Sequence, residues 1–417
     1  MKLKRVVVTG IGALTPLGNN LEDYWNNLVN GVSGADFIKQ FDAEKFRTKF
    51  ACEVKNFEPT TFLDKKEARK IDRFTQFALY VSDQAMNDAN LNKDNINPDR
   101  VGVVFASGIG GLITFQNEVI EFAKGDGTPR FNPFFIPKMI LDIAAGQISM
   151  RHNLRGPNFA VVSACASSTN AIIEAYNLLR LGKADIILAG GSEAVISQAG
   201  VGGFNAMKAM SERNDDPKTA SRPYDKDRDG FVMGEAAGML VLEELEHALA
   251  RGAKIYCEIA GGGATADAHH ITAPHPEGLG AKNVMLVALD DAGMKPENID
   301  YINTHGTSTP AGDIPEVKAI MHVFGEHIYN MNISSTKSMT GHCLGAAGVI
   351  EAIACVQSVV HDVVPPTINH FTDDPDLDPK INFTFNAAQK RTVNAALSNT
   401  FGFGGHNACV IVKKFVA

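Results

Sequence analysis

The chain has 417 residues, of which 45% are hydrophobic and 21% are charged, and its formal net charge at pH 7 is −8. A chain of this length exceeds the usual size of a single hydrophobic core, so two domains or two fused halves are expected. The negative net charge argues against nucleic acid as a partner, because phosphate binding requires a basic surface.

The sequence contains no recognisable targeting or membrane segment. Polar and glycine residues interrupt the short apolar run that follows MKLK, which speaks against a secretory signal. The most apolar stretch, residues 345–360, contains Glu351 and Gln357 and is not expected to span a membrane. The six cysteines show no CxxC spacing, so neither a zinc site nor a redox dithiol is indicated. We therefore expect a cytoplasmic protein with reduced thiols.

The dominant pattern along the chain is a short β-branched run, a Gly- or Ser-rich turn and then a helix. In the first half, strands are expected at Lys4–Thr9, Arg100–Ala106, Phe159–Ala164 and Asp185–Ala189. The scheme restarts after Gly252, with strands expected at Lys254–Ala260, Asp300–Thr304, Asn332–Ser335, Ala395–Ser398 and Ala408–Lys413. Alternating strands and helices predict an α/β fold with buried parallel strands. We expect a duplicated α/β unit with halves at residues 1–252 and 253–417.

Three segments imitate binding motifs but lack an essential part. Gly10-Ile-Gly12 lacks the third glycine of a dinucleotide-binding loop. Residues 225–230 (DKDRDG) resemble an EF-hand, but its twelfth position is Ala236 instead of a bidentate Glu. Adjacent histidines such as His269 and His270 point to opposite faces of a strand and cannot easily share one ion. We therefore expect no nucleotide or metal site in these segments.

A cysteine stands where a buried strand is expected to give way to a helix. Cys165 lies in VVSACASSTN, and a helical pattern runs from there to about Leu181. Free backbone N–H groups and the helix dipole lower the pKa of a thiol at such a position. The alternative interpretation is a buried cysteine that only packs, and this segment alone does not distinguish the two.

Two histidines and a lysine in the second half occupy similar positions. His305 lies in NTHGTSTPAGD, and Lys337 and His342 lie in STKSMTGH. Open α/β sheets bind ligands at the C-terminal ends of their strands, so this combination favours an active site. A lysine near two histidines would keep them neutral through like-charge repulsion. The alternative for Lys337 is a surface lysine in a turn.

Together, the motifs SACASS, NTHGTSTPAGD and STKSMTGH resemble those of the elongating, Cys-His-His type of 3-oxoacyl-[acyl-carrier-protein] synthases, in particular the bacterial synthase II group. The resemblance extends from VVVTGIGALTPLG to SNTFGFGG. It implies a thiolase-like fold, with duplicated α/β halves in a five-layered αβαβα arrangement, usually as a homodimer. This sequence departs from the pattern at Cys343, where relatives usually carry Leu, and at His406, where a small hydroxyl residue is expected.

The resemblance implies fatty acid chain elongation, and the residue types suit that chemistry. In this reaction, a decarboxylative Claisen condensation joins malonyl-carrier to an acyl-enzyme and releases 3-oxoacyl-carrier, CO₂ and free carrier. The Cys165 thiolate would hold the acyl group. The N–H donors of His305 and His342 would stabilise the negative charge that forms on the malonyl thioester as CO₂ leaves. No cofactor is expected, because the substrates arrive on the phosphopantetheine of acyl carrier protein.

Further roles follow from the resemblance alone. The backbone N–H groups of Cys165 and Phe403 would form an oxyanion hole. The supporting residues would be the gating Phe403, the phosphopantetheine ligands Thr307 and Thr309, the acyl-pocket residue Ile109, and Lys337 with Glu351 as its ionic neighbour.

A basic stripe is expected near residue 64, where an Asp-x-x-Glu pattern predicts a helix start. Helical spacing would place four basic residues on one face, namely Lys66, Arg69, Lys70 and Arg73. The resemblance implies that this helix docks the acidic carrier protein, with Lys208 as a second contact. The alternative is a solvated helix face.

There are four alternative functions to this interpretation. An initiating synthase uses Cys-His-Asn, so the motif around His342 disfavours it. A thiolase carries a second catalytic cysteine, and no such motif is evident. A cysteine hydrolase would need a base but no machinery for decarboxylation. A non-catalytic subunit of a polyketide system typically lacks the nucleophilic cysteine.

Overall fold

The computed structural model describes residues 3–416, and its centre is a ten-stranded sheet. The strand order is β10-β9-β13-β14-β8-β1-β7-β6-β4-β5. The bounds are β1 (Val6–Leu14), β4 (Val101–Ala106), β5 (Asn158–Val161), β6 (Ile186–Glu193), β7 (Ala236–Glu244), β8 (Cys257–Ala266), β9 (Tyr301–Asn303), β10 (Asn332–Ser334), β13 (Ala395–Gly402) and β14 (His406–Lys413). Two small sheets pair β2 (Asp36–Phe37) with β3 (Phe50–Ala51) and β11 (Val363–Val364) with β12 (Gln389–Lys390).

The large sheet consists of two five-stranded halves with the same internal order. In the first half, β1, β7 and β6 are antiparallel neighbours, and β6, β4 and β5 are parallel neighbours. In the second half, β8, β14 and β13 are antiparallel, and β13, β9 and β10 are parallel. Antiparallel pairing of β1 with β8 joins the halves. The predicted duplication is therefore confirmed.

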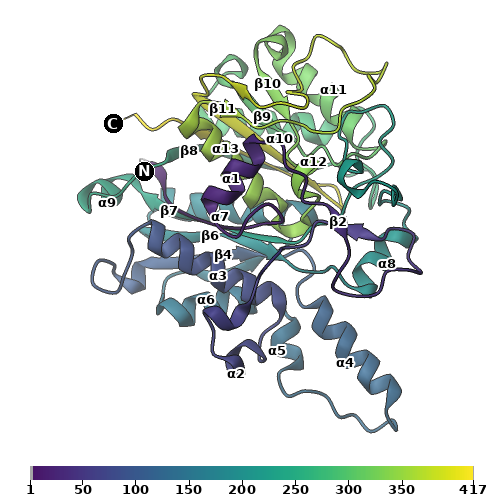
Figure 1. Ribbon diagram of the computed structural model, residues 1–417. Coiled ribbons are helices and arrows are strands. Elements are labelled where there is room, and N and C mark those ends of the chain that lie inside the picture. The colour runs from purple at the N-terminus through teal and green to yellow at the C-terminus, as the bar shows by residue number, and fades with distance from the viewer. Residues whose placement is uncertain (1–2, 417) are drawn as a thin grey trace.

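Helices form three layers around and between the half-sheets (Figure 1). The central layer contains α7 (Ser167–Arg180) and α13 (Ala347–His361). The outer layers contain α3 (Arg73–Asp88) and α6 (Ile143–His152) on the first half, and α10 (Leu279–Ala292) and α11 (Asp313–Phe324) on the second. Strand β6 shows why the layers stack: Ile187 and Ala189 pack into the central cluster, whereas Ile186 and Leu188 pack into the outer one. This is the predicted five-layered αβαβα arrangement.

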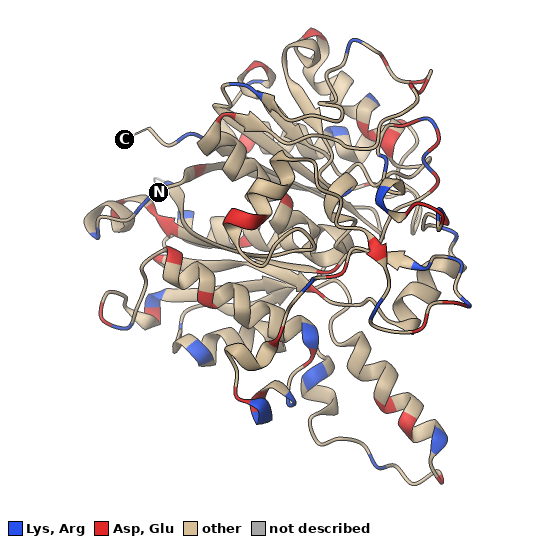
Figure 2. Ribbon diagram, in the orientation of Figure 1, with Lys and Arg blue, Asp and Glu red and all other residues tan. Residues whose placement is uncertain are grey.

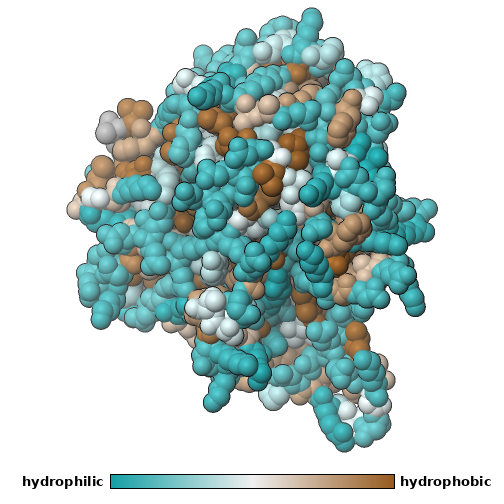
Figure 3. Space-filling view, in the orientation of Figure 1, coloured by the Kyte–Doolittle hydropathy of each residue, from teal (hydrophilic) through white to brown (hydrophobic). Residues whose placement is uncertain are grey.

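The remaining α-helices are α1 (Leu21–Val29), α2 (Lys65–Ala68), α4 (Leu112–Lys124), α5 (Phe135–Met139), α8 (Gln198–Ala206), α9 (Leu245–Ala250) and α12 (Lys337–Thr340). Helices α4 and α5 extend away from the layered body (Figure 1). Hydrophobic residues on the face shown in Figure 3 are scattered among hydrophilic ones.

The first strand is longer than the sequence predicted, because β1 continues through Gly10 and Gly12 to Leu14. These glycines let the backbone of α3 lie directly on the strand. A Cβ atom at Gly12 would lie 2.1 Å from the carbonyl oxygen of Val81, and one at Gly10 would lie 2.5 Å from that of Ala85. The glycines therefore serve close packing of a helix on a strand.

The apolar segment noted in the sequence forms the turn η7 (Leu344–Ala346) and the central helix α13. Leu344–His361 is long and apolar enough to cross a membrane by length and composition, but 89% of it is buried inside the protein. It packs against strands of both half-sheets. Its apolar composition is thus that of a core helix, which needs a hydrophobic surface all round.

The predicted basic helix is interrupted. Asp64 caps α2 as predicted, by accepting the N–H of Lys66, but α2 ends at Ala68. A new helix starts at Arg73 because the Asp72 side chain caps it. The Arg73 guanidinium turns inward and donates to the buried Glu235 carboxylate at 2.7 and 3.1 Å. The prediction of one continuous stripe that includes Arg73 is therefore wrong, and the members of the predicted stripe that are exposed are Lys66, Arg69 and Lys70. Basic residues gather around α2 in Figure 2.

Candidate active site

The predicted chemical residues follow the C-terminal ends of three strands. Cys165 lies in the 3₁₀ turn η3 (Ala164–Ala166), between β5 and α7. His305 follows β9. Lys337 opens α12 after β10, and His342 follows α12, before the turn η7 (Leu344–Ala346) and α13. Strands β5 and β10 are equivalent but lie at opposite ends of the strand order, and the residues meet because η3 and η7, which precede the central helices α7 and α13, pack against each other.

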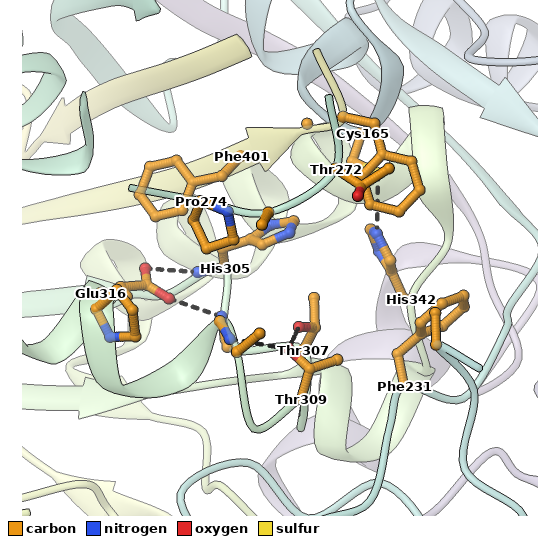
Figure 4. Close-up of a pocket in the computed structure, with 18 of the residues that line it drawn as sticks. Cys165, Phe231, Thr272, Pro274, His305, Thr307, Thr309, Glu316, His342 and Phe401 are labelled. Carbon is orange, nitrogen blue, oxygen red and sulfur yellow. Dashed lines mark hydrogen bonds between the residues drawn. The ribbon is translucent and has the colours of Figure 1, made fainter. Parts of the chain in front are cut away.

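A cavity of about 360 Å³ lies where these segments meet (Figure 4). Cys165, His305 and His342 line it. The other predicted site residues in its wall are Thr307, Thr309, Phe403 and Lys208. Ile109 does not line the cavity, and its side chain is 37% exposed. The structure thus brings together the thiol and imidazoles but leaves Ile109 outside.

The thiol and the two imidazoles converge. His342 Nε2 lies 3.1 Å from Cys165 Sγ. The rings of His305 and His342 stand perpendicular to each other, with centroids 5.2 Å apart. A molecule that enters the cavity thus meets the Cys165 sulfur and the imidazole rings of His305 and His342.

Both histidines are held in their neutral form. Burial lowers the pKa of His305 and of His342 well below 6.5, and the nearby Lys337 ammonium lowers both further. The sequence anticipated the repulsion by Lys337, whereas the larger contribution of burial comes from the fold.

The expected lowering of the thiol pKa does not occur. Burial raises the pKa of Cys165 to about 12, although the Lys337 charge and a hydrogen bond from the Phe403 backbone oppose this effect. The argument from the helix N-terminus is therefore wrong in its net result, because it omitted the cost of forming a thiolate away from water. The thiol is protonated at neutral pH, and His342 lies within reach of its proton.

Lys337 is a buried residue with an ionic partner. Its side chain is only 1% exposed, which contradicts the alternative of a surface lysine. Its ammonium forms an ion pair with Glu351 of α13. Burial raises the pKa of Glu351 to about 7, and Lys337 opposes that rise. The pair lies behind the cavity, since neither residue lines it.

One carboxylate near His305 escaped the sequence argument. Glu316 of α11 accepts the backbone N–H groups of His305 and Gly306, both at 2.8 Å (Figure 4). It is buried, and burial raises its pKa to about 7. The available signal was an acidic residue in the first turn of the helix that follows the His305 motif.

The segment around Phe403 is tied to a neighbouring loop. The N–H of Gly404 donates to the carbonyl of Ile271 at 2.7 Å, and the N–H of Asp267 donates to the carbonyl of Gly405 at 2.8 Å. Residues 402–405 and 267–278 both contribute to the cavity wall. The two departures from the family pattern lie outside this wall: Cys343 is buried, and His406 is exposed.

Another polar contact in the wall joins the hydroxyl groups of Thr307 and Thr309, which lie 3.0 Å apart. Within residues 3–416, no group of three or more His, Cys, Asp or Glu side chains is arranged to hold a metal ion.

Comparison with known families identifies the family of the chain. Residues 3–248 match the beta-ketoacyl synthase, N-terminal domain, and residues 256–371 match the beta-ketoacyl synthase, C-terminal domain. The chain belongs to the beta-ketoacyl synthase family. This ketosynthase is 50% identical over 416 residues to 3-oxoacyl-[acyl-carrier-protein] synthase 2 of Synechocystis sp., which covers 100% of this chain and 99% of the relative. It is also 50% identical over 414 residues to 3-oxoacyl-[acyl-carrier-protein] synthase 2 of Staphylococcus aureus, with 99% of each chain covered.

Solved ketosynthases share the whole fold. A beta-ketoacyl synthase from Burkholderia phymatum matches with a TM-score of 0.91 and 34% identity over 99% of this chain and 100% of that chain. A type II polyketide acyl-carrier protein in complex with its ketosynthase matches with a TM-score of 0.91 and 32% identity, at the same coverage. The predicted family and thiolase-like fold are confirmed.

Proposed function

We propose that this ketosynthase elongates fatty acyl chains by condensing an acyl group held on Cys165 with malonyl-[acyl-carrier-protein]. The observation that carries the proposal is the convergence of one thiol and two neutral imidazoles on a single cavity. Full-length identity of 50% to 3-oxoacyl-[acyl-carrier-protein] synthases 2 supports the same reaction.

In the first step, the Cys165 sulfur attacks the thioester carbonyl of an acyl-carrier. A new S–C bond forms, and the bond to the carrier sulfur breaks. His342 Nε2, at 3.1 Å from the Cys165 sulfur, accepts the thiol proton and passes it to the departing carrier thiolate. The backbone N–H groups of Cys165 and Phe403 stabilise the oxyanion.

In the second step, malonyl-carrier loses its carboxylate as CO₂. The C–C electron pair moves into an enolate, and neutral N–H donors of His305 and His342 stabilise its oxygen. For His342 this step uses the tautomer with the proton on Nε2, whereas the first step uses the tautomer with Nε2 unprotonated. The enolate carbon attacks the acyl-Cys165 carbonyl, and the sulfur leaves as a thiolate that takes a proton from solvent, which yields 3-oxoacyl-carrier and the free thiol. Burial and, to a smaller extent, the charge of Lys337 keep both imidazoles neutral, and Glu351 balances the charge of Lys337. This chemistry uses no cofactor beyond the carrier-bound phosphopantetheine.

The substrate carrier is acyl carrier protein. Its phosphopantetheine arm contacts the hydroxyl groups of Thr307 and Thr309, and Phe403 gates the cavity. Exposed cations receive the acidic carrier, namely Lys66, Arg69, Lys70 and Lys208. A solved ketosynthase in complex with an acyl-carrier protein supports this partnership.

The working form is a cytoplasmic homodimer. Strand β5 is one edge of the large sheet, and two hydrophobic residues are exposed there, Phe159 in the strand and Val162 directly after it. A second copy that covers this edge would satisfy its backbone groups. Ile109, exposed in the single chain, would shape the acyl pocket in that assembly. The two functional halves are residues 1–252, which carry the thiol, and 253–417, which carry the histidines.

The test supplies acyl-carrier and malonyl-carrier and follows both CO₂ release and carrier products by mass spectrometry. We expect one CO₂ for each 3-oxoacyl-carrier formed. Release of free fatty acid without CO₂ would instead identify a cysteine hydrolase and overturn the proposal.

A further inference from the structure

The last residue of β6, Glu193, is a buried carboxylate that the reaction above does not use. Its side chain has no exposed surface. Within residues 3–416, no Lys, Arg or His forms a salt bridge with it, in contrast to Glu351 with Lys337. Burial of an unpaired charge is costly unless hydrogen bonds replace the lost water. The Glu193 carboxylate must therefore be stabilised by hydrogen bonds from its neighbours.

Five hydrogen-bond donors surround the Glu193 carboxylate. Oε1 accepts from the Ser107 hydroxyl at 3.0 Å and from the N–H groups of Ile109 and Gly110 at 3.2 and 3.3 Å. Oε2 accepts from the N–H groups of Gly108 at 2.8 Å and Gly345 at 3.0 Å. Because the Ser107 oxygen also accepts from Gly110, its hydrogen is directed to Glu193. All partners donate, so they stabilise the ionised carboxylate and oppose the rise in the pKa of Glu193 that burial causes.

The Oε2 atom joins the two halves of the molecule beside the reacting groups. Gly108 follows β4 of the first half, and Gly345 lies in η7 of the second half, three residues after His342. A Cβ atom at Gly345 would lie 2.2 Å from the Gly108 nitrogen. A Cβ atom at Gly108 would lie 3.4 Å from the carbonyl oxygen of Ala164, the residue before Cys165. Glu193 therefore accepts hydrogen bonds at the place where the segment that carries the thiol packs against the segment that carries His342.

We propose that Glu193 is a positioning residue, which fixes the segment after His342 against the turn beside Cys165 and so sets the 3.1 Å approach of His342 Nε2 to the sulfur. The inference rests on the proposed function, because it assigns Glu193 a role in that reaction without contact to substrate. A misplacement of about 1 Å between reacting groups can cost ~10²-fold in rate.

The charge of Glu193 provides a readout that stability alone would not move. The charged or titratable groups that face Cys165 are His305, His342, Lys337, Glu351 and Glu193. The negative charges of Glu193 and Glu351 raise the pKa of Cys165, whereas Lys337 lowers it. Removal of the Glu193 charge should therefore make the thiol easier to ionise, even where positioning is lost.

The test compares the wild type with Glu193→Gln. The glutamine NH₂ group cannot accept a hydrogen bond, so it would face backbone N–H donors on one side. We expect alkylation of Cys165 by iodoacetamide, followed across pH by mass spectrometry, to move to lower pH. Condensation kcat should fall about 10–100-fold, the scale of lost hydrogen bonds to a charged group, while KM for the carrier changes less than about twofold.

Asp72→Asn is the matched control. Asp72 is also a buried carboxylate that accepts backbone N–H groups, from Phe74 at 3.3 Å and Thr114 at 3.0 Å, but it caps α3 instead of lining the junction. This variant should lower Tm without moving the alkylation profile. An unchanged profile or kcat in Glu193→Gln, or the same profile shift in Asp72→Asn, would overturn the proposal.

Two further outcomes remain informative. If Glu193→Gln does not fold, Ser107→Ala removes one donor and keeps the four backbone donors. A loss of several-fold in kcat is then expected, from about 1 kcal/mol for one hydrogen bond, and a normal kcat would refute the positioning role.

Alkylation requires neither carrier nor malonyl group. Failure of the wild type to condense would therefore refute the proposed function, while the alkylation profiles still decide on Glu193.

Discussion

The turn that presents Cys165 in the first half is repeated in the second half, with different chemistry. In each half, a 3₁₀ turn precedes a central helix, η3 before α7 and η7 before α13. The first residue of each turn, Ala164 or Leu344, has a positive φ, 51° and 47°. The equivalent of Cys165 is then Gly345, whose N–H binds Glu193. One turn exposes a nucleophile to the cavity, and its counterpart closes the junction between the halves.

This difference shows how a duplicated fold divides labour. A left-handed conformation at a residue other than glycine costs energy and persists only where the surrounding structure requires it. The same strained turn is present twice, but only one copy keeps a reactive side chain. The second copy has glycine, Gly345, at this position, and the absence of a side chain lets the segment that carries His342 pack close to the thiol.

The largest expected effect comes from removing the nucleophile. Cys165→Ala should abolish acyl-enzyme formation and reduce condensation to background, because the other half has no thiol at the equivalent position. Mass spectrometry after incubation with acyl-carrier should place the acyl group on the Cys165 peptide of the wild type. Cys343→Ala is the control, since this buried cysteine lies outside the cavity wall. Acylation of another cysteine would contradict the assignment.

The histidines should affect decarboxylation more than acylation. His305→Ala and His342→Ala should each slow CO₂ release from malonyl-carrier by about 10²–10³-fold, the scale for one lost oxyanion donor. Both should retain some acylation, with His342→Ala the slower because only His342 approaches the sulfur at 3.1 Å. The double variant should be little worse than either single one. Normal decarboxylation with lost acylation would mean that the histidines serve only as bases.

The closed turn should tolerate no side chain. In Gly345→Ala, the new Cβ atom would lie 2.2 Å from the Gly108 nitrogen, so we expect a loss of about 1–3 kcal/mol in unfolding free energy. Gly146→Ala in α6 is the control, because a Cβ atom there meets no atom within 4 Å. Denaturant unfolding measures both. Equal stability of the two variants would mean that the junction is loosely packed.

Surface charge should influence carrier binding but leave the two turns unaffected. Charge reversal at Lys66, Arg69 and Lys70 together should raise KM for the carrier about tenfold and weaken its dependence on salt, because these side chains are exposed. Kinetics from about 50 to 200 mM salt provide the measurement. An unchanged KM would mean that these residues form a solvated surface with no role in carrier docking. Lys93→Glu, elsewhere on the exposed surface, is the control.

The smallest expected effect concerns pH. Acyl transfer requires His342 unprotonated, and its pKa lies well below 6.5. The acylation rate should therefore fall less than about twofold between pH 7.5 and 6.5, whereas an ordinary histidine would be half protonated at pH 6.5. Single-turnover acylation at fixed ionic strength tests this. A rate that halves by pH 6.5 would show that burial and Lys337 do not control the imidazole.

The sequence by itself determined the motifs and their places at strand ends. The segments around Cys165, His305 and His342 carry local signals, because strand-to-turn junctions with small residues are written in adjacent positions. The alternating strands and helices likewise predicted the duplicated α/β fold. Such properties depend on a few neighbouring residues, so they survive without knowledge of distant contacts.

Only the tertiary structure decided the properties that depend on burial and long-range contact. It separated Arg73 from the basic residues near α2 by pairing it with Glu235, 162 positions away. It raised the thiol pKa by removing water from Cys165. It also brought Glu193 to Gly345, 152 positions later, and so placed a carboxylate at the junction of the halves. Charge stabilisation and pKa depend on the solvent and donors around a group in space, and these are set by packing of segments remote in sequence.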